Sequence, residues 1–109
     1  MVQPDPISPD EVVLKRAGAN YWRGAEAVGG HLHITADRLL FQPHALNATT
    51  YRAEIRVSDI ADVLPKNTLG FVPNGMLVTT KSGQQHQFVV WGRAGLIDLI
   101  KNVASQSQA

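Results

Sequence analysis

The stretch Gly30-His31-Leu32-His33-Ile34-Thr35-Ala36-Asp37-Arg38-Leu39-Leu40-Phe41 decides the fold of this chain. Polar and apolar residues alternate before the dipeptide Ala36-Asp37, which is the period of a half-buried β-strand. A two-residue hairpin at that dipeptide puts four apolar side chains on one face, Ile34 opposite Leu39 and Leu32 opposite Phe41. A slip of one residue would split these four between the two faces, so the pattern also predicts the register.

Further strands are expected on both sides of this hairpin. One covers 20–28 and ends in a turn at Gly29-Gly30, and another covers 51–57. Four shorter strands follow, over 60–64, 69–72, 76–80 and 84–91. They are separated by turns that include Pro73-Asn74-Gly75 and Lys81-Ser82-Gly83. The second of these loops has two or three residues, which leaves two registers for the last hairpin.

A helix is expected near each end of the chain. Ser8, Pro9 and Glu11 form a helix-start signature, and Gly18 is a plausible stop, although Val12-Val13 would also suit a strand. After Gly92 the period of the apolar residues changes to that of an amphipathic helix of about three turns. Its apolar positions are Leu96, Ile97, Ile100, Val103 and Ala104.

Length and composition indicate one globular domain. The 109 residues allow a single core, expected over 10–104 between flexible tails at 1–9 and 105–109. Ten Lys and Arg against nine Asp and Glu leave a net charge of +1, which argues against a nucleic-acid partner. The absence of cysteine excludes disulfides and thiolate nucleophiles. Without a signal peptide or an apolar run of spanning length, we expect a cytoplasmic protein.

About seven short strands followed by one amphipathic helix predict a mainly β (α+β) fold. A small antiparallel sheet can curl and place the helix over its open end, which protects its edges and buries one face. This is the architecture of a pleckstrin-homology-like barrel.

Several segments, in order, resemble the GRAM domain family. The stretch from Gly30 to Phe41 resembles the family's signature hairpin, and Ser58-Asp59-Ile60 resembles its Asp-Ile step. Glu11-Val12-Val13-Leu14 resembles its entry, and Lys81-Ser82-Gly83 with Phe88-Val89-Val90 resembles its last hairpin. The resemblance covers about residues 10–104. It implies a pleckstrin-homology-like fold and a role in lipid or protein binding rather than catalysis.

Three polar or apolar motifs each have a structural interpretation that we favour. His31-x-His33 puts two imidazoles on the polar face of a strand, but zinc needs further ligands, so we expect no metal site. Arg52-Glu54-Arg56 suits a solvated face with self-neutralising pairs better than an anion patch. The apolar stretch 69–73 suits an edge strand better than a membrane-dipping loop.

The two tryptophans, Trp22 and Trp91, are expected to pack rather than to act as interfacial anchors. No nucleophile elbow, phosphate-cradling glycine loop or metal-binding helix motif occurs, so we expect no enzyme activity and no cofactor.

The sequence therefore predicts a small binding module that docks on membrane lipid or on a partner protein. The alternative is a homo-oligomerising interaction domain without lipid binding. Any membrane affinity should be weak and salt-sensitive, because the basic residues are spread over several elements. The predicted contact residues are Arg38, Arg52, Arg56, Lys66, Phe71 and Lys81.

Overall fold

The predicted hairpin is the centre of one antiparallel sheet, seen in a computed structural model that describes residues 4–23, 26–44, 52–68 and 72–107. Seven strands of these described residues pair in the order β4-β3-β2-β1-β7-β6-β5. A single turn of 3-10 helix, η1 (Val57–Asp59), joins β4 to β5. The strands are β1 (Lys15–Arg23), β2 (Glu26–Ile34), β3 (Arg38–Pro43), β4 (Ala53–Arg56), β5 (Ile60–Thr68), β6 (Val72–Thr80) and β7 (Gln85–Val90).

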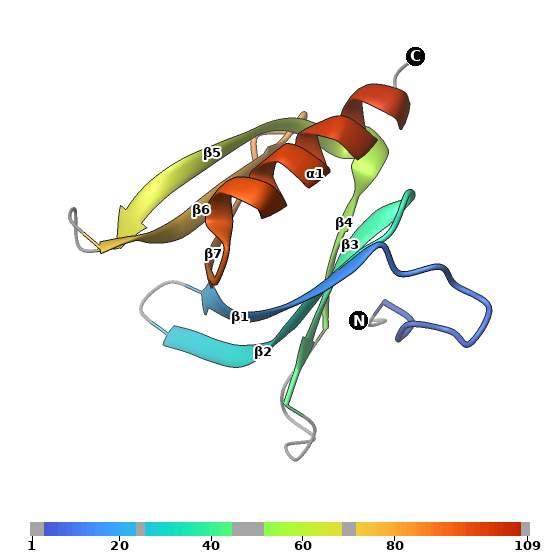
Figure 1. Ribbon diagram of the computed structural model, residues 1–109, viewed down its shortest axis with the longest axis horizontal. Helices are drawn as coiled ribbons and strands as arrows, with labels where there is room; N and C mark the ends of the chain where they lie inside the picture. The colour runs from blue at the N-terminus through green and yellow to red at the C-terminus, as the bar shows by residue number, and fades with distance from the viewer. Residues whose placement is uncertain (1–3, 24–25, 45–51, 69–71, 108–109) are drawn as a thin grey trace.

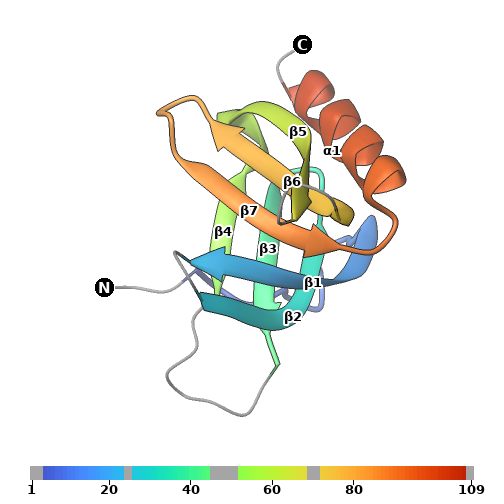
Figure 2. The same cartoon turned by 90° about the vertical axis from the view of Figure 1, so that its left-hand side faces the viewer.

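The sheet curls strongly, and the helix α1 (Arg93–Ser107) lies across one end of it against β5, β6 and η1 (Figures 1 and 2). Its buried side chains are the predicted ones, Leu96, Ile97, Ile100, Val103 and Ala104. The curled sheet with a terminal helix is therefore confirmed. No helix of the described residues is long and apolar enough to cross a membrane.

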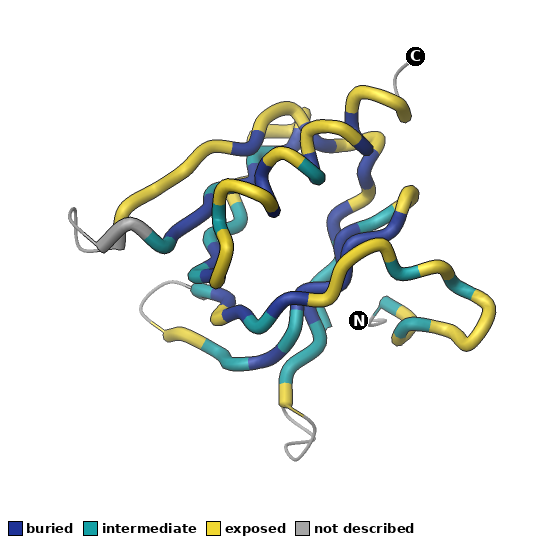
Figure 3. Tube along the Cα trace, viewed as in Figure 1, coloured by how far each residue is buried: buried dark blue, intermediate teal, exposed yellow. Residues whose placement is uncertain are grey.

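The register predicted for the first hairpin is confirmed. Ile34 pairs with Leu39 and Leu32 pairs with Phe41. All four side chains are buried in the space that the sheet and helix enclose, where the buried residues gather in Figure 3. The ring of Phe41 lies 5.4 Å from that of Tyr21 and 6.3 Å from that of Phe88, which joins β3 to β1 and β7 across the core.

The predicted turn at Gly29-Gly30 is wrong, because β2 runs through both glycines from Glu26 to Ile34. Gly30 pairs with Pro43, and a Cβ atom on Gly30 would lie 2.2 Å from the Gln42 carbonyl oxygen. The glycine therefore serves a close approach of two backbones where the sheet curls, and not a reversal of the chain. The predicted strand over 20–28 is accordingly split between β1 and β2.

The predicted turn at Pro73-Asn74-Gly75 is also wrong. These residues belong to β6, where Gly75 pairs with both Lys66 and Val89. The last hairpin has a three-residue loop, because the Thr80 amide donates to the Gln84 carbonyl at 2.8 Å, and Gly83 adopts a positive φ of 93°. Residues 69–71 of the predicted strand 69–72 lie outside the described residues.

The predicted N-terminal helix is wrong as well. Ser8 and Glu11 form one turn through two hydrogen bonds of 3.1 and 3.3 Å, but the Leu14 amide then donates to the Ile34 carbonyl at 2.7 Å. Hydrogen bonding to the sheet is thus more favourable here than a helix. The first turn of a helix is costly to form, and the β-branched residues Val12 and Val13 disfavour its continuation. Residues 4–14 instead form an extended N-terminal strap. The predicted boundary of the domain at residue 10 stays a prediction.

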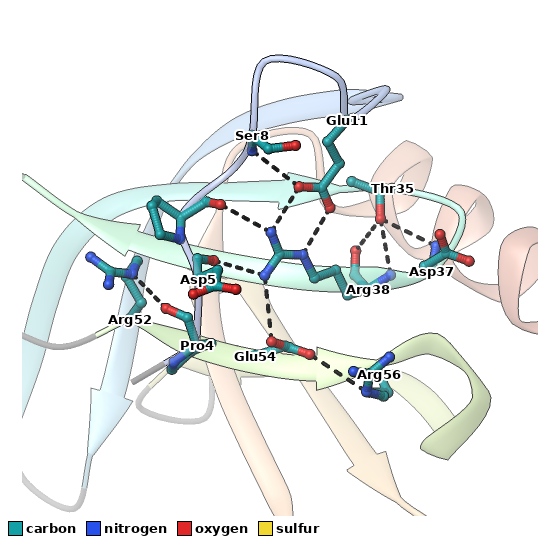
Figure 4. A network of polar contacts seen from close by, with 11 residues as sticks. Pro4, Asp5, Ser8, Glu11, Thr35, Asp37, Arg38, Arg52, Glu54 and Arg56 are labelled. Atoms are coloured by element: carbon teal, nitrogen blue, oxygen red, sulfur yellow. Dashed lines mark hydrogen bonds and ion pairs between the residues drawn. The ribbon is translucent and has the colours of Figure 1, made fainter. Parts of the chain in front are cut away.

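Two arginines hold the strap on the outer side of β3 and β4 (Figure 4). The guanidinium of Arg38 donates to both carboxylate oxygens of Glu11, at 2.7 and 2.8 Å, and to the carbonyls of Asp5 and Pro6. Arg52 donates to the Pro4 carbonyl at 2.8 Å. Leu40, whose neighbours in β3 point to the core, is also fully buried but is not part of the core cluster.

The substitution Phe41→Ala should lower the free energy of unfolding by about 3–5 kcal/mol, because it removes a fully buried ring that links three strands. Urea denaturation measures this, with Val12→Ala, at a side chain 73% exposed, as the control. An unchanged unfolding midpoint for Phe41→Ala would contradict the register.

A second prediction concerns acid stability. The side-chain hydrogen bond from Arg38 lowers the pKa of Glu11 from 4.5 to about 2. The ionised pair therefore stabilises the fold above pH 4.5, and this contribution is lost as the pH falls towards 2. Glu11→Gln should cost about 1–3 kcal/mol at pH 7 and nothing near pH 2, since the pair is partly exposed to solvent.

Urea denaturation at several pH values measures the Glu11→Gln difference, and Asp98→Asn, at an exposed carboxylate of α1, is the control. If the wild-type and Glu11→Gln proteins lost stability in parallel between pH 4.5 and 2, another carboxylate would carry the effect.

Candidate functional site

Of the residues predicted from sequence to contact lipid or a partner, the structure brings together only the three arginines, on the outer side of β3 and β4, where Arg38 and Arg56 are cross-strand partners (Figure 4). Arg38 and Arg52 hold the strap, and Arg56 is exposed and pairs with Glu54 at 3.7 Å. Lys66 lies in β5 and Lys81 follows β6, both exposed. Phe71 lies outside the described residues. A role for any of the six in binding stays a prediction.

A groove lies instead on the outer face of β1, β2 and β7. Its volume is about 320 Å³. It is lined by Gly18, Ala19, Asn20, Gly30, His31, His44, Val89 and Trp91. Glycines of the strands leave room for the groove because they have no side chain to fill it. Gly18 of β1 is one of them, and a Cβ atom added to it would lie 3.7 Å from the Trp91 ring.

His31 and His44 line the groove, and Arg16 lies next to His31. A guanidinium nitrogen of Arg16 lies 3.4 Å from Nδ1 of His31, and the rings of His31 and His44 meet edge to face at 5.4 Å. The backbone amide of His44 donates to the Gly29 carbonyl at 3.1 Å, which ties His44 to β2. These three residues come from β1, β2 and the segment after β3, so only the folded sheet brings them together.

The surroundings of His31 disfavour its protonated form. Burial lowers the pKa of His31, and the positive charges of Arg16 and His44 lower it further. None of the described residues that line the groove is Asp or Glu. The neutral form of His31 is therefore favoured, and in this form its Nδ1 can accept a hydrogen bond from the Arg16 guanidinium.

The opposite wall is the indole of Trp91, which is 79% exposed. The expected packing of Trp91 is thus wrong: β7 ends at Val90, and the positive φ of Gly92 starts the turn into α1, which leaves the indole outside the core. On its other side lies a second hollow of about 270 Å³. Lys15, Gly92, Gly95, Leu96 and Leu99 line it together with Trp91.

The other histidines have different surroundings. His33 is buried on the outer side of the sheet, and burial lowers its pKa. His86 also has a lowered pKa because of burial, and its Nδ1 lies 2.7 Å from the Tyr21 hydroxyl. No group of three metal-ligating side chains occurs in the described part of the chain.

Comparison with known proteins identifies the family. The model of the GRAM domain matches residues 2–106. The chain belongs to the GRAM domain family. No curated protein matches this GRAM domain.

Solved structures show the same fold at low sequence identity. The C-terminal domain of an unknown protein from Leishmania infantum has a TM-score of 0.75 at 19% identity, over 86% of this chain and 84% of that one. The linker-DH/PH domains of p115-RhoGEF have a TM-score of 0.70 at 14% identity, over 89% of this chain and 30% of that one. The Slm1-PH domain in complex with phosphoserine has a TM-score of 0.60 at 12% identity, over 84% and 91%. The resemblance that the sequence predicted is therefore confirmed.

Sequence reasoning missed the groove of this GRAM domain because its residues carry no common motif. Arg16 falls in the wrongly predicted helix, His44 in a polar connection, and Trp91 in the predicted last strand. Only the pairing of Gly18 with His31 and of Asn20 with both Gly29 and Val89 places these segments on one face.

Removing Arg16 should raise the pKa of His31, because Arg16→Ala takes away a positive neighbour and some of the burial. Nuclear magnetic resonance titration of the imidazole signals measures this pKa, with Arg56→Ala as a control that removes an exposed cation elsewhere. An unchanged His31 pKa in Arg16→Ala would show that the two side chains do not interact in solution.

Proposed function

We propose that this GRAM domain is a non-catalytic module that docks on anionic membrane lipid. The observation that carries the proposal is the exposed indole of Trp91, which borders both the groove lined by His31 and His44 and the second hollow lined by Lys15. We call this surface the Trp91 face, defined by Trp91, Lys15, Arg16, His31 and His44.

The chemistry of the Trp91 face suits a membrane interface. Tryptophan combines a large apolar ring with one polar N–H group, and it is enriched where lipid headgroups meet the acyl chains. Lys15 lines the second hollow together with the indole, and each basic side chain near an anionic surface adds about 1 kcal/mol. An apolar anchor with basic neighbours thus combines insertion with attraction to charge.

The structural neighbours support an anionic headgroup. The Slm1-PH domain was solved in complex with phosphoserine and also with inositol-4-phosphate, the latter with a TM-score of 0.57 and 10% identity over 84% of this chain. At identities this low, the likeness supports a common fold only. The proposed ligand of the present chain therefore rests on the residues of its own Trp91 face.

The binding should be peripheral, weak and sensitive to salt. Two or three basic side chains supply about 2–3 kcal/mol, and screening over a Debye length of about 10 Å at 0.1 M salt removes much of it. Arg56, Lys66 and Lys81 are exposed on other elements, and none of them lines the groove or the second hollow beside Trp91.

Sedimentation with vesicles tests the proposal. The protein should sediment with phosphatidylcholine vesicles that contain anionic phosphatidylserine, and less with phosphatidylcholine alone. Trp91→Ala should weaken the binding about tenfold, because the indole can no longer insert. Leu64→Ala, at an exposed apolar residue of β5, is the matched control and should bind like the wild type.

Two results would overturn this function. Absence of binding to both vesicle types would leave docking on a partner protein or homo-oligomerisation, and light scattering over a dilution series separates these two. Binding that survives Trp91→Ala unchanged would place the lipid contact on another surface.

A further inference from the structure

We infer that two copies of this chain meet through the outer face of β5 and β6 and form a weak symmetric dimer. We call this surface the β5–β6 patch, defined by Asp62, Leu64, Lys66, Leu77 and Thr79. The inference goes beyond membrane docking and does not depend on it, because Trp91 follows β7 and lies outside the patch.

The outer face of β5 and β6 carries apolar side chains that no described helix covers. Val63 and Met76 belong to the buried core that α1 also joins, so α1 lies on the inner side of these strands. Because side chains alternate along a strand, their neighbours Leu64 and Leu77 point to the opposite side. Leu64 is 44% exposed, Leu77 is half-buried, and most of β5 is exposed in Figure 3. This face is therefore accessible to another molecule.

The free edge of β5 is protected against the addition of another strand. β5 is the last strand in the sheet order, so one of its edges has no strand partner among the described residues. Pro65 has no amide hydrogen, and a proline in an edge strand turns its nitrogen to the open side. The amide of Val63, two residues away, points to the same side and donates to the Asp62 carboxylate at 2.8 Å. We therefore expect contact through the outer face of β5 and not through its edge.

The outward residues of β5 form a self-complementary pattern. Asp62 and Lys66 are both exposed, and each lies two residues from Leu64, about 7 Å along the strand. A two-fold axis that crosses the strand at Leu64 therefore brings the Leu64 side chains of two copies together. The same axis places Asp62 of each copy opposite Lys66 of the other, so an ion pair flanks the apolar centre on each side.

The neighbouring strand β6 extends this pattern. The outward residues of the two strands pair as Leu64 with Leu77, Asp62 with Thr79 and Lys66 with Gly75. The axis through Leu64 therefore also passes over Leu77, which adds a second apolar contact. It places Thr79 of each copy opposite Gly75 of the other, where the missing side chain leaves room. Both strands thus present a surface that fits a second copy of itself.

The charge and the size of the β5–β6 patch favour a weak contact with a second copy. The patch holds one carboxylate and one ammonium group, so it attracts neither a strongly anionic nor a strongly cationic surface. Its area is small, because the two strands lie about 5 Å apart and the stretch from Asp62 to Lys66 spans about 13 Å. Interfaces at the low end of the size range are weak and transient. The dimer should therefore form only at high protein concentration.

Sedimentation equilibrium over a dilution series tests the dimer. The average mass of the wild type should rise towards that of a dimer as the concentration increases from about 10 μM to about 1 mM. Leu64→Asp should weaken the association about a hundredfold, since two carboxylates would meet on the axis. Leu14→Asp is the matched control, because Leu14 is 47% exposed and lies outside the patch, and it should dimerise like the wild type. A wild type that stays monomeric over the whole range would overturn the inference.

Charge variants test the symmetry of the contact. Asp62→Lys and Lys66→Asp each create two like-charge pairs across the axis, so each variant alone should dimerise about tenfold more weakly than the wild type. In an equimolar mixture the two variants present opposite charges at both contacts, and they should associate with each other about as tightly as the wild type. Two variants that melt like the wild type but gain no association on mixing would overturn the two-fold contact.

A measurement on the unchanged chain serves as a second test, because Asp62→Lys also loses the hydrogen bond to the Val63 amide. In nuclear magnetic resonance spectra, the amide signals of Leu64 and Leu77 should shift as the protein concentration rises, and that of Arg38 on the opposite side of the sheet order should not. Shifts confined to residues outside the β5–β6 patch would place the contact elsewhere and overturn the inference.

Discussion

The pairing of β2 with β3 is the constraint on which both the core and the candidate site depend. Its register turns Leu32, Ile34, Leu39 and Phe41 inwards, and the same alternation turns His31 outwards. Because Gly30 lets the Gln42 carbonyl approach closely, the sheet can curl at that point and bring the segment with His44 beside β2. A slip of one residue would therefore destroy the core and the groove together.

The alternation of polar and apolar residues predicted the strands well, because it depends only on which face of each strand is buried. The first hairpin, the terminal helix and its buried positions all follow from periodicity alone. The errors occur where a residue with a strong local preference is used in a tertiary contact. Gly29-Gly30 allows a close backbone approach, and the turn at Ser8 and Glu11 ends because the Leu14 amide pairs with Ile34.

The candidate site was not predictable in the same way. Its residues are joined by cross-strand pairing between segments far apart in sequence, such as Gly18 with His31 and Asn20 with Val89. Exposure of Trp91 depends on where β7 stops and α1 begins, and a tryptophan beside a helix carries no local signal for that choice. The family resemblance predicted a binding module. Its motifs, however, consist of residues that build the sheet, so they do not indicate which surface binds.

The distribution of charge shows why a net charge of +1 is a poor guide to this surface. The strap places Glu11 and three backbone carbonyls on Arg38 and Arg52, so two basic side chains of the outer sheet face are occupied by the chain itself. Glu54 lies near both Arg38 and Arg56. Glu11 and Glu54 thereby compensate the arginines of β3 and β4, whereas the described lining of the groove holds no carboxylate. The position of the strap therefore determines which basic side chains are compensated by the chain itself: Arg38 and Arg52 are, whereas Arg16 lies on β1, away from the strap contacts.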